Sequence, residues 1–223
     1  MVSVMSQTFN LSLLSILILA CIVPVLAVPS NVSERPEFEA NLVLEINSLR
    51  ERPWKYEPYL SAYQELLRRD VLYLPYRKPF KLYEGAGVLQ IAKENIVKRG
   101  ITGLLTRSVA LDSVARSHLK DLLDNPALGH TGKDGATFAT RIRRQINPAG
   151  PVGENITFND ATPRQALLTM VIDDGVATRQ HRENIFSPDF MLIGTACGTR
   201  SDGQNICVVV FAAKLIPAGI REL

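Results

Sequence analysis

Two apolar runs near the end of the chain constrain the fold more than any other feature. Residues 192–197 and 206–211 are rich in β-branched side chains and flank a Ser-Asp-Gly turn, so they predict two antiparallel strands. A hairpin centred on Asp202 places Cys197 directly opposite Cys207, where the two Cβ atoms are close enough for a disulfide. The alternative is a pair of free, buried thiols.

The first 27 residues contain no charged side chain, and residues 11–26 are almost wholly apolar. Small residues end this segment, so residues 1–27 are predicted to be a secretory signal peptide. One alternative is an uncleaved membrane anchor, which Pro24 would interrupt. A bacterial lipoprotein signal ending at Cys21 is a third interpretation, and the apolar residues that continue beyond Cys21 argue against it.

The remainder of the chain is long enough for one domain with a hydrophobic core. We predict a flexible segment at 28–37, the domain at 38–213 and a tail at 214–223. The net charge of +3 indicates neither nucleic acid nor a membrane surface as a partner, and the basic residues are scattered apart from residues 141–144. Asn31 begins an Asn-Val-Ser sequon and is a candidate glycosylation site.

Apolar residues at helical spacing predict four helices. They are Glu37–Arg52, Glu84–Arg99, Ser108–Asp124 and Pro163–Asp174. The aromatic- and proline-rich segment 55–80 is predicted to be a loop that holds a short helix at 61–69. Together with the strands, this order predicts an α+β domain in which helices cover a small antiparallel sheet.

Three polar residues are expected to have structural roles. His118 lies on the apolar face of the third helix, where a lone histidine is more often a hydrogen-bonded core residue than a ligand. Arg141 is expected to pair with Asp134 or with a loop carboxylate. Asn155 begins a second sequon, but it lies inside a motif and is expected to hold the fold.

Groups able to bind a metal or transfer protons are concentrated between Gly129 and Phe190. The segment contains four short motifs, each beside glycines or turn formers: 129–131, 153–156, 172–175 and 181–186. Imidazoles together with carboxylates suit zinc, and an open position would leave room for an activated water. The chain lacks the His-Glu-x-x-His and Gly-x-Ser-x-Gly signatures of hydrolases. The alternative is a hydrogen-bonded network that only holds the loops.

At these motifs the sequence resembles the CAP superfamily, the cysteine-rich secretory, antigen 5 and pathogenesis-related 1 group, whose domains are also called SCP-like extracellular domains. The resemblance covers roughly Phe38 to Ala213. It rests on the order and spacing of the Gly-His-Thr motif, the Gly-Glu-Asn-Ile motif, residues 181–186 and the apolar run 207–212. It implies an α-β-α sandwich with a small three-stranded antiparallel sheet flanked by helices.

The resemblance also implies a cleft with two histidines and two acids that binds a divalent metal in several family members. His130 and His181 match the histidines, and Glu154 matches the first acid. The second acid is usually a glutamate three residues after a tryptophan. Here Asp173 and Met170 stand at these two positions, and aspartate is one methylene shorter. We predict that His130, Glu154, Asp173 and His181 converge.

The function that the resemblance implies is that of a secreted, extracellular binding module, because the group has no common catalytic activity. Its cleft would hold a divalent metal, with zinc as the candidate cofactor. Its grooves would take a small apolar ligand, such as a sterol or fatty acid, or an extracellular protein. A metal-dependent extracellular hydrolase or peptidase is the alternative. We expect no nucleic-acid partner and no stable membrane insertion after signal cleavage.

Overall fold

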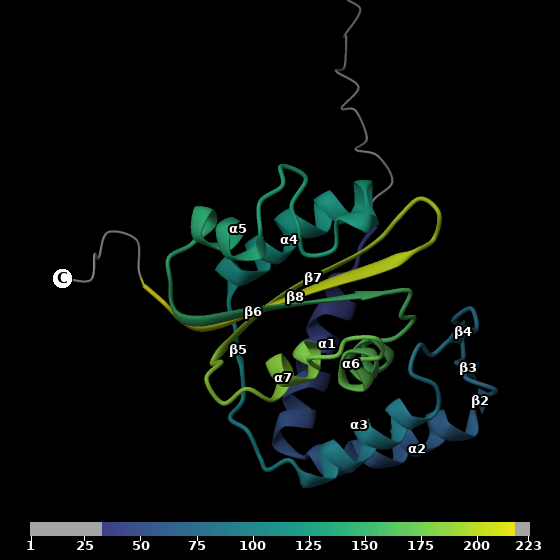
Figure 1. Cartoon of the computed structure of the whole chain (residues 1–223). Coiled ribbons are helices and arrows are strands. Elements are labelled where there is room, and N and C mark those ends of the chain that lie inside the picture. Colours follow the sequence, from purple (N-terminus) through teal and green to yellow (C-terminus); the bar gives the residue numbers. More distant parts are fainter. Residues whose placement is uncertain (1–32, 217–223) are drawn as a thin grey trace, which may run out of the picture. The chain divides into compact units, whose positions relative to one another are not determined.

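The computed structural model describes residues 33–216 of the chain. The predicted signal peptide, Asn31 and residues 217–223 lie outside the described residues. Three long strands form the centre: β6 (Pro148–Phe158), β7 (Leu192–Thr199) and β8 (Asn205–Leu215). They are antiparallel, with β8 between β7 and β6 (Figure 1). This arrangement confirms the predicted α+β class and the small three-stranded antiparallel sheet.

The side chains of β8 alternate between two apolar layers, as the twofold periodicity of a strand requires. Cys207, Val209 and Phe211 belong to one buried cluster, whereas Val208 belongs to the other. Cys197 pairs directly with Cys207 across the hairpin, and the two residues form a disulfide. The pairing inferred from the symmetry of the hairpin is therefore confirmed.

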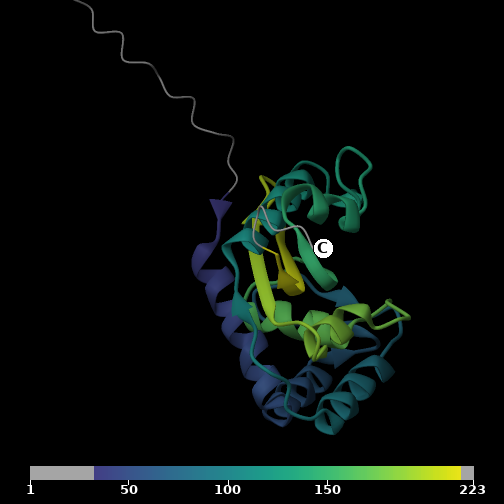
Figure 2. The same ribbon diagram turned by 90° about the vertical axis from the view of Figure 1, so that its left-hand side faces the viewer.

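Helices cover both faces of the sheet (Figures 1 and 2). One layer contains α4 (Val109–Asp124), the short 3-10 helix η2 (Pro126–Leu128) and α5 (Phe138–Gln145). The other layer contains α1 (Pro36–Glu51), α6 (Pro163–Ile172) and α7 (Gln180–Phe186). Beneath that second layer lie α2 (Glu57–Glu65) and α3 (Gly87–Lys98). The described part is thus an α-β-α sandwich, as the resemblance implied.

The close packing of α4 against β7 depends on the glycine at position 194. A Cβ at Gly194 would lie 2.2 Å from the carbonyl carbon of Leu111, so no side chain fits there. Leu111, Val114 and Ala115 are fully buried at this contact side of α4. The backbone of α4 therefore lies directly against β7, and the hydrophobic layer between α4 and the sheet can be thin.

Two short strands cover the ends of the outer edge of β7. β1 (Ser33–Glu34) pairs with β7 in antiparallel orientation at one end, and β5 (Thr106–Arg107) pairs with it in parallel orientation at the other. A second, smaller sheet lies elsewhere in the chain. It is formed by β2 (Leu67–Arg68), β3 (Val71–Leu72) and β4 (Phe80–Lys81), each two residues long.

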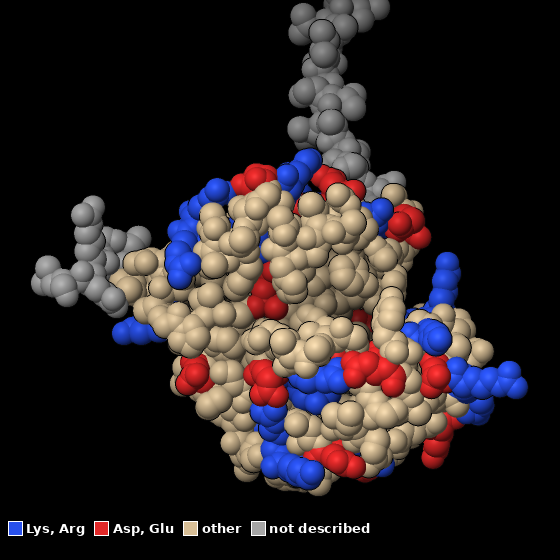
Figure 3. Space-filling view, in the orientation of Figure 1, with Lys and Arg blue, Asp and Glu red and all other residues tan. Residues whose placement is uncertain are grey.

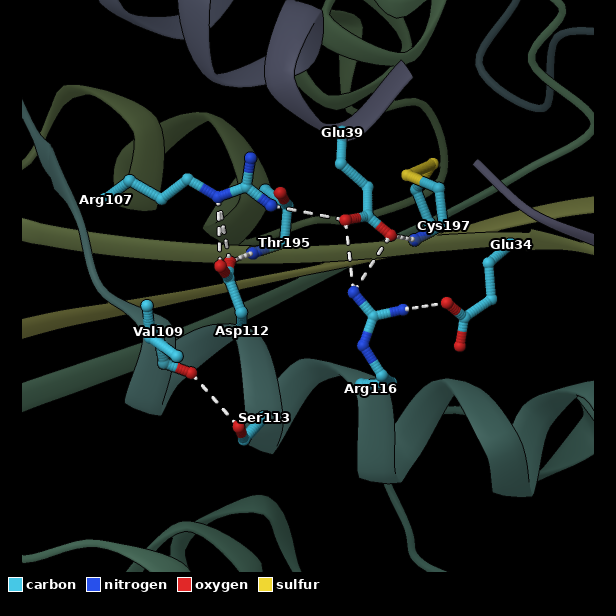
Figure 4. Close-up of polar contacts among 10 residues, drawn as sticks. Glu34, Glu39, Arg107, Val109, Asp112, Ser113, Arg116, Thr195 and Cys197 are labelled. Atoms are coloured by element: carbon cyan, nitrogen blue, oxygen red, sulfur yellow. Dashed lines mark hydrogen bonds and ion pairs between the residues drawn. A yellow bond between two sulfur atoms is a disulfide. The ribbon is translucent and has the colours of Figure 1, made fainter. Parts of the chain in front are cut away.

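Two carboxylates, the buried Glu39 and the partly buried Asp112, close the part of the β7 edge between β1 and β5 (Figure 4). Glu39 accepts a hydrogen bond from the Cys197 N–H at 2.9 Å, and Asp112 accepts one from the Thr195 N–H at 2.8 Å. Two arginines pair with these carboxylates: Arg107 and Arg116. The edge therefore offers few unpaired backbone groups to another chain.

The cap of α6 confirms the predicted start of that helix. Thr162 accepts a hydrogen bond from the Gln165 N–H, and Pro163 occupies the first turn. The predicted end at Asp174 is wrong by two residues, because Asp173 adopts a left-handed conformation with φ of 56°. That turn directs the Asp173 carboxylate back toward α7, which matters for the site described below.

The segment 53–86 differs most from its prediction. The 3-10 helix η1 (Pro53–Tyr56) leads directly into α2, which ends at Glu65, so the helix expected at 61–69 is wrong in both limits. Pro58 lies in the first turn of α2, where its missing N–H costs nothing. The loop expected after it contains the β2–β4 meander, and α3 begins at Gly87 instead of Glu84. Helix α5 had no counterpart in the sequence prediction.

The described domain extends slightly beyond its predicted limits. β1 and the start of α1 precede Phe38, so residues 33–37 are part of the fold, and β8 continues to Leu215. Pairing with β7 explains the first difference, and pairing of Leu215 with Pro148 explains the second. Within residues 33–216, no helix has the length and apolar character needed to span a membrane.

Candidate functional site

The four residues expected to converge meet at the outer edge of β6, which has no neighbouring strand among residues 33–216. Glu154 lies within β6 and pairs with Val210, so it faces the layer of α4 and α5. His130 lies in the loop between η2 and α5. Asp173 follows α6, and His181 is the second residue of α7, so both come from the opposite layer. The site therefore straddles the sheet edge, with one histidine from each layer.

His130, Glu154 and His181 line a cavity of about 600 Å³. The centroids of the two imidazole rings lie 6.2 Å apart, and their planes are inclined by 32°. The His130 side chain is 53% exposed and that of His181 is 19% exposed, so solvent reaches both. Figure 3 shows a hollow between the two helical layers with acidic side chains at its base.

A buried ion pair between Glu154 and Arg141 supports the His130 ring at its Nδ1 atom. Nδ1 of His130 lies 2.9 Å from Oε1 of Glu154, whose side chain is only 1% exposed. Arg141 of α5 donates from Nη2 to both Glu154 oxygens, at 2.8 and 2.9 Å, and to the His130 carbonyl at 3.1 Å. Because the guanidinium balances the charge of the carboxylate, Glu154 can be buried and still accept the imidazole N–H.

The second histidine has an equivalent support. Nδ1 of His181 lies 2.6 Å from Oδ1 of Asp173, whose side chain is fully buried. Oδ2 of Asp173 accepts the backbone N–H of Arg182 at 3.1 Å, and Arg179 donates to the Asp173 carbonyl. The left-handed conformation of Asp173 thus places its carboxylate between the end of α6 and the start of α7.

These contacts determine the tautomer of each ring when it is neutral. A carboxylate accepts hydrogen bonds, so each Nδ1 carries the proton, and the Nε2 of a neutral ring keeps its lone pair. No group within residues 33–216 is hydrogen-bonded to either Nε2. Each carboxylate contacts the Nδ1 of its imidazole and leaves Nε2 free of it. The described residues contain no cluster of three or more His, Cys, Asp or Glu arranged around one metal position.

Two asparagines connect β6 to α7 next to the cavity. Asn155 donates to the His181 carbonyl at 2.9 Å, and Asn184 donates to Oδ1 of Asn155 at 2.8 Å. A Cβ at Gly153 would lie 2.9 Å from the side chain of Asn184, so glycine is needed for this contact. Asn155 is fully buried, which confirms its structural role and excludes its glycosylation in the folded state.

His118 has the structural role expected from its position. It is fully buried, and its Nε2 donates to the Gly129 carbonyl at 2.7 Å. Burial lowers the pKa of His118, so its ring is neutral. Gly129 has a φ of 55°, a conformation that favours glycine. The bond therefore holds the turn that leads into His130.

Two arginines of the site were missed or misassigned. Arg141 was expected to pair with Asp134 or with a loop carboxylate, and this expectation is wrong. Asp134 pairs with Arg144, and Arg141 pairs with Glu154, which lies in the strand β6. Arg182 is 1% exposed and donates to the carbonyls of Val171 and Ile172 at the end of α6. The sequence signal for Arg182 was its position inside the motif 181–186. Its contact with α6 is favourable because a cation near a helix C-terminus interacts well with the last carbonyls.

Three solved structures are similar to this chain. An outer surface protein from Borrelia burgdorferi is 19% identical, with a TM-score of 0.44, and the match covers 58% of this chain and 88% of that one. An extracellular protein containing an SCP domain from Bacillus anthracis is 24% identical, with a TM-score of 0.43 and coverages of 57% and 41%. A cysteine-rich secretory protein from Staphylococcus aureus is 11% identical, with a TM-score of 0.38 and coverages of 57% and 37%.

The match spans less than half of the length of the second and third of these proteins. A comparison with curated proteins found no match. The model of the family described as CAP, the cysteine-rich secretory protein family, matches residues 99–211, which is about half of the chain and includes His130, Glu154, Asp173 and His181. The chain belongs to the CAP family.

Proposed function

We propose that this protein is a secreted binding protein whose cleft holds a divalent metal ion, with zinc as the candidate, through His130 and His181. One observation carries the proposal: the two imidazoles line one cavity, and each has its Nδ1 held by a buried carboxylate. The Nε2 atoms are then the ring nitrogens left to act as ligands.

The separation of the two rings fits ligands of one ion. With a zinc–nitrogen bond of about 2 Å, the centre of a bound imidazole lies about 3 Å from the metal, so two such rings have centres about 5–6 Å apart. The observed 6.2 Å is slightly larger. His130 lies in a loop and is half-exposed, so its ring has room for the small shift that a shared ion would require.

Glu154 and Asp173 would orient the histidines instead of ligating the metal directly. Outer-shell carboxylates of this kind typically contribute about 10–100-fold to metal affinity. Water or a bound ligand would fill the remaining coordination positions. A bound zinc ion would supply positive charge and an exchangeable position, which suits recognition of an anionic or carbonyl group.

Zinc binding by the purified protein, measured by isothermal titration calorimetry at neutral pH, tests the proposal. The double variant His130→Ala/His181→Ala should abolish binding, and Asp173→Asn should weaken it about 10–100-fold. Glu37→Gln is the matched control, because Glu37 is an exposed acid that forms no ion pair within residues 33–216, and it should bind as the wild type does.

Two other outcomes have clear meanings. A folded wild-type protein that binds no zinc would contradict the proposal and leave the histidine pairs as a hydrogen-bonded scaffold. Zinc-dependent cleavage of a peptide or ester that is lost in the double histidine variant would favour the hydrolase alternative, because it shares the metal but adds turnover.

A separate cavity favours a small apolar ligand, such as a fatty acid or sterol, as a second occupant. It measures about 730 Å³ and lies between α1, α2 and α6, within the usual range of ligand pockets. Aromatic and aliphatic side chains line it: Leu44, Tyr56, Tyr59, Tyr63 and Leu168. Ala62→Trp should fill the cavity and prevent displacement of a fluorescent fatty acid, whereas Ala40→Trp, on an exposed part of α1, should not.

The disulfide supports the proposed extracellular location, because such bonds persist in oxidising compartments. The bond joins β7 and β8 at the centre of the fold, so the folded structure contains both cysteines in their oxidised form. The location is consistent with a family described as secretory.

A further inference from the structure

The segment from Leu67 to Tyr83 gathers cations and aromatic rings that the metal cleft does not use. Its exposed basic residues are Arg68, Arg69, Lys78 and Lys81, and its exposed aromatic residues are Tyr73, Tyr76 and Tyr83. Figure 3 shows Lys and Arg side chains projecting from the side of the molecule where Figure 1 places β2, β3 and β4. These residues come from the β2–β4 meander, which Figure 1 shows at this side of the molecule.

The loop between β3 and β4 is anchored beneath its exposed side chains. Arg77 forms an ion pair with the buried carboxylate of Asp160, donates to Thr169 at 3.2 Å and stacks on Phe80 at 4.0 Å. On the other side of Tyr76, the carbonyl of Pro75 accepts a hydrogen bond from Gln165 at 2.9 Å. The loop is therefore held at both ends, and its conformation does not depend on a ligand.

Tyr76 is displayed in an unusual conformation. Its φ is 60°, in the left-handed region that a bulky residue rarely adopts, and its side chain is 91% exposed. An aromatic side chain gains nothing for the fold in this position. Strained residues that the surrounding structure holds in place are concentrated at binding sites.

A groove of about 640 Å³ lies beside this loop. Tyr76, Lys78 and Phe80 form one side, and the β7–β8 turn with Gln204 forms the other, together with Asn159. The only carboxylate in the lining belongs to Asp202, and it is paired with Arg200. Lys78 of this lining has no carboxylate partner within residues 33–216. The groove thus combines cations, an aromatic ring and amide groups.

We propose that this groove binds an acidic polysaccharide, that is, a sugar chain carrying sulfate or carboxylate groups. Lys78 would pair with an anionic group of the chain. The ring of Tyr76 would stack on the apolar face of a sugar, and the amides of Asn159 and Gln204 would hydrogen-bond to hydroxyl groups. The site is separate from the metal cleft, because the two cavities share no lining residue.

The same cations could also contact an anionic membrane, but the lining favours a polysaccharide. Binding to a bilayer relies on apolar side chains that enter the acyl region. The exposed large side chains of this segment are tyrosines, whereas exposed aliphatic residues such as Leu44, Ile91 and Leu104 belong to α1, α3 and the loop before β5. A groove also matches a linear chain better than a flat lipid surface.

Binding of the purified protein to immobilised heparin, a sulfated polysaccharide, tests the proposal, with dextran as the neutral comparison. Lys78→Ala should weaken heparin binding about threefold and reduce its dependence on salt, since one ion pair fewer is screened. Tyr76→Ala should weaken binding at constant salt dependence, and Tyr76→Phe should retain most of it. The changed side chains are exposed, so the melting temperature should stay that of the wild type.

Lys120→Ala is the matched control, because it removes the same charge from an exposed position outside the groove lining. It should bind heparin as the wild type does. Equal losses in both variants would show that only the net charge matters and would overturn the proposal. Tighter binding to vesicles of phosphatidylserine and phosphatidylcholine than to heparin, lost in Lys78→Ala, would overturn it in favour of a membrane.

Discussion

Arg141 is the residue on which the site depends most at the scale of single side chains. Its guanidinium is the cation paired with Glu154, and both side chains are almost fully buried. Arg141→Met should leave the carboxylate buried without its partner and lower the free energy of unfolding by about 3–5 kcal/mol. Urea denaturation measures the change. The neighbouring control Arg143→Ala removes an exposed cation and should change stability little; a small effect of Arg141→Met would contradict the assigned role of the ion pair.

The pKa of His118 predicts a pH dependence of stability. Burial lowers this pKa in the folded state, so the unfolded chain binds a proton more readily. The contribution of neutral His118 is fully present above the unfolded pKa of about 6.5 and is lost as the pH falls toward the folded value. The free energy of unfolding should therefore decrease as the pH falls below about 6.5.

His118→Gln separates this effect from that of the other histidines. Glutamine can still donate to the Gly129 carbonyl but does not titrate. The difference in stability between the variant and the wild type should shrink or change sign in acid. If the two proteins show the same pH dependence, the decrease originates elsewhere.

At the scale of elements, the carboxylate of Glu39 accepts a backbone N–H of β7 that would otherwise need an additional edge strand as its partner. It accepts the Cys197 N–H and pairs with Arg107 and Arg116, although its side chain is only 1% exposed. Glu39→Ala should lower the free energy of unfolding by about 1–3 kcal/mol, because the buried N–H loses its acceptor. It should also expose the β7 edge to self-association.

Chemical denaturation and sedimentation velocity measure the two effects of Glu39→Ala. Glu37→Ala is the control, since it removes an exposed acid from the same helix. A Glu39→Ala protein as stable and as monomeric as this control would show that β1 and β5 protect the edge without the carboxylate.

The sequence correctly predicted those elements whose structure is determined by residues close together in the chain. The hairpin of β7 and β8 follows from β-branched runs around a turn, and the start of α6 follows from Thr162, Pro163 and Gln165. Tertiary contacts decided the remaining boundaries. α6 ends early because Asp173 turns toward His181 and Arg182, and α3 starts late because Glu84 accepts hydrogen bonds from Gly175 and Arg179.

The candidate site was only partly accessible from the sequence for a similar reason. The motifs and the resemblance identified His130, Glu154, Asp173 and His181 as residues that meet. They did not indicate that the carboxylates would bind Nδ1, because that depends on how β6 is placed between α5 and α7. Arg141 was assigned to the wrong partner because α5, which carries it, has few apolar residues to reveal its periodicity.

At the scale of the whole molecule, the site joins the two helical layers across one edge of the sheet. His130 comes with the layer of α4 and α5, and His181 with the layer of α6 and α7. Neither layer contains a complete site. A ligand that holds both histidines would therefore connect the layers, and its binding would stabilise the folded state by mass action.

The central claim is that both histidines are held at Nδ1 and present Nε2 to a shared metal. Nitrogen-15 NMR of the histidine rings, before and during addition of zinc to the metal-free protein, tests it most directly. We predict that His130 and His181 are protonated at Nδ1 and that their Nε2 resonances shift together on zinc binding. His118, which donates from Nε2, is the internal control with the opposite tautomer and should not shift. Rings of His130 and His181 protonated at Nε2, or unaffected by zinc, would contradict the account.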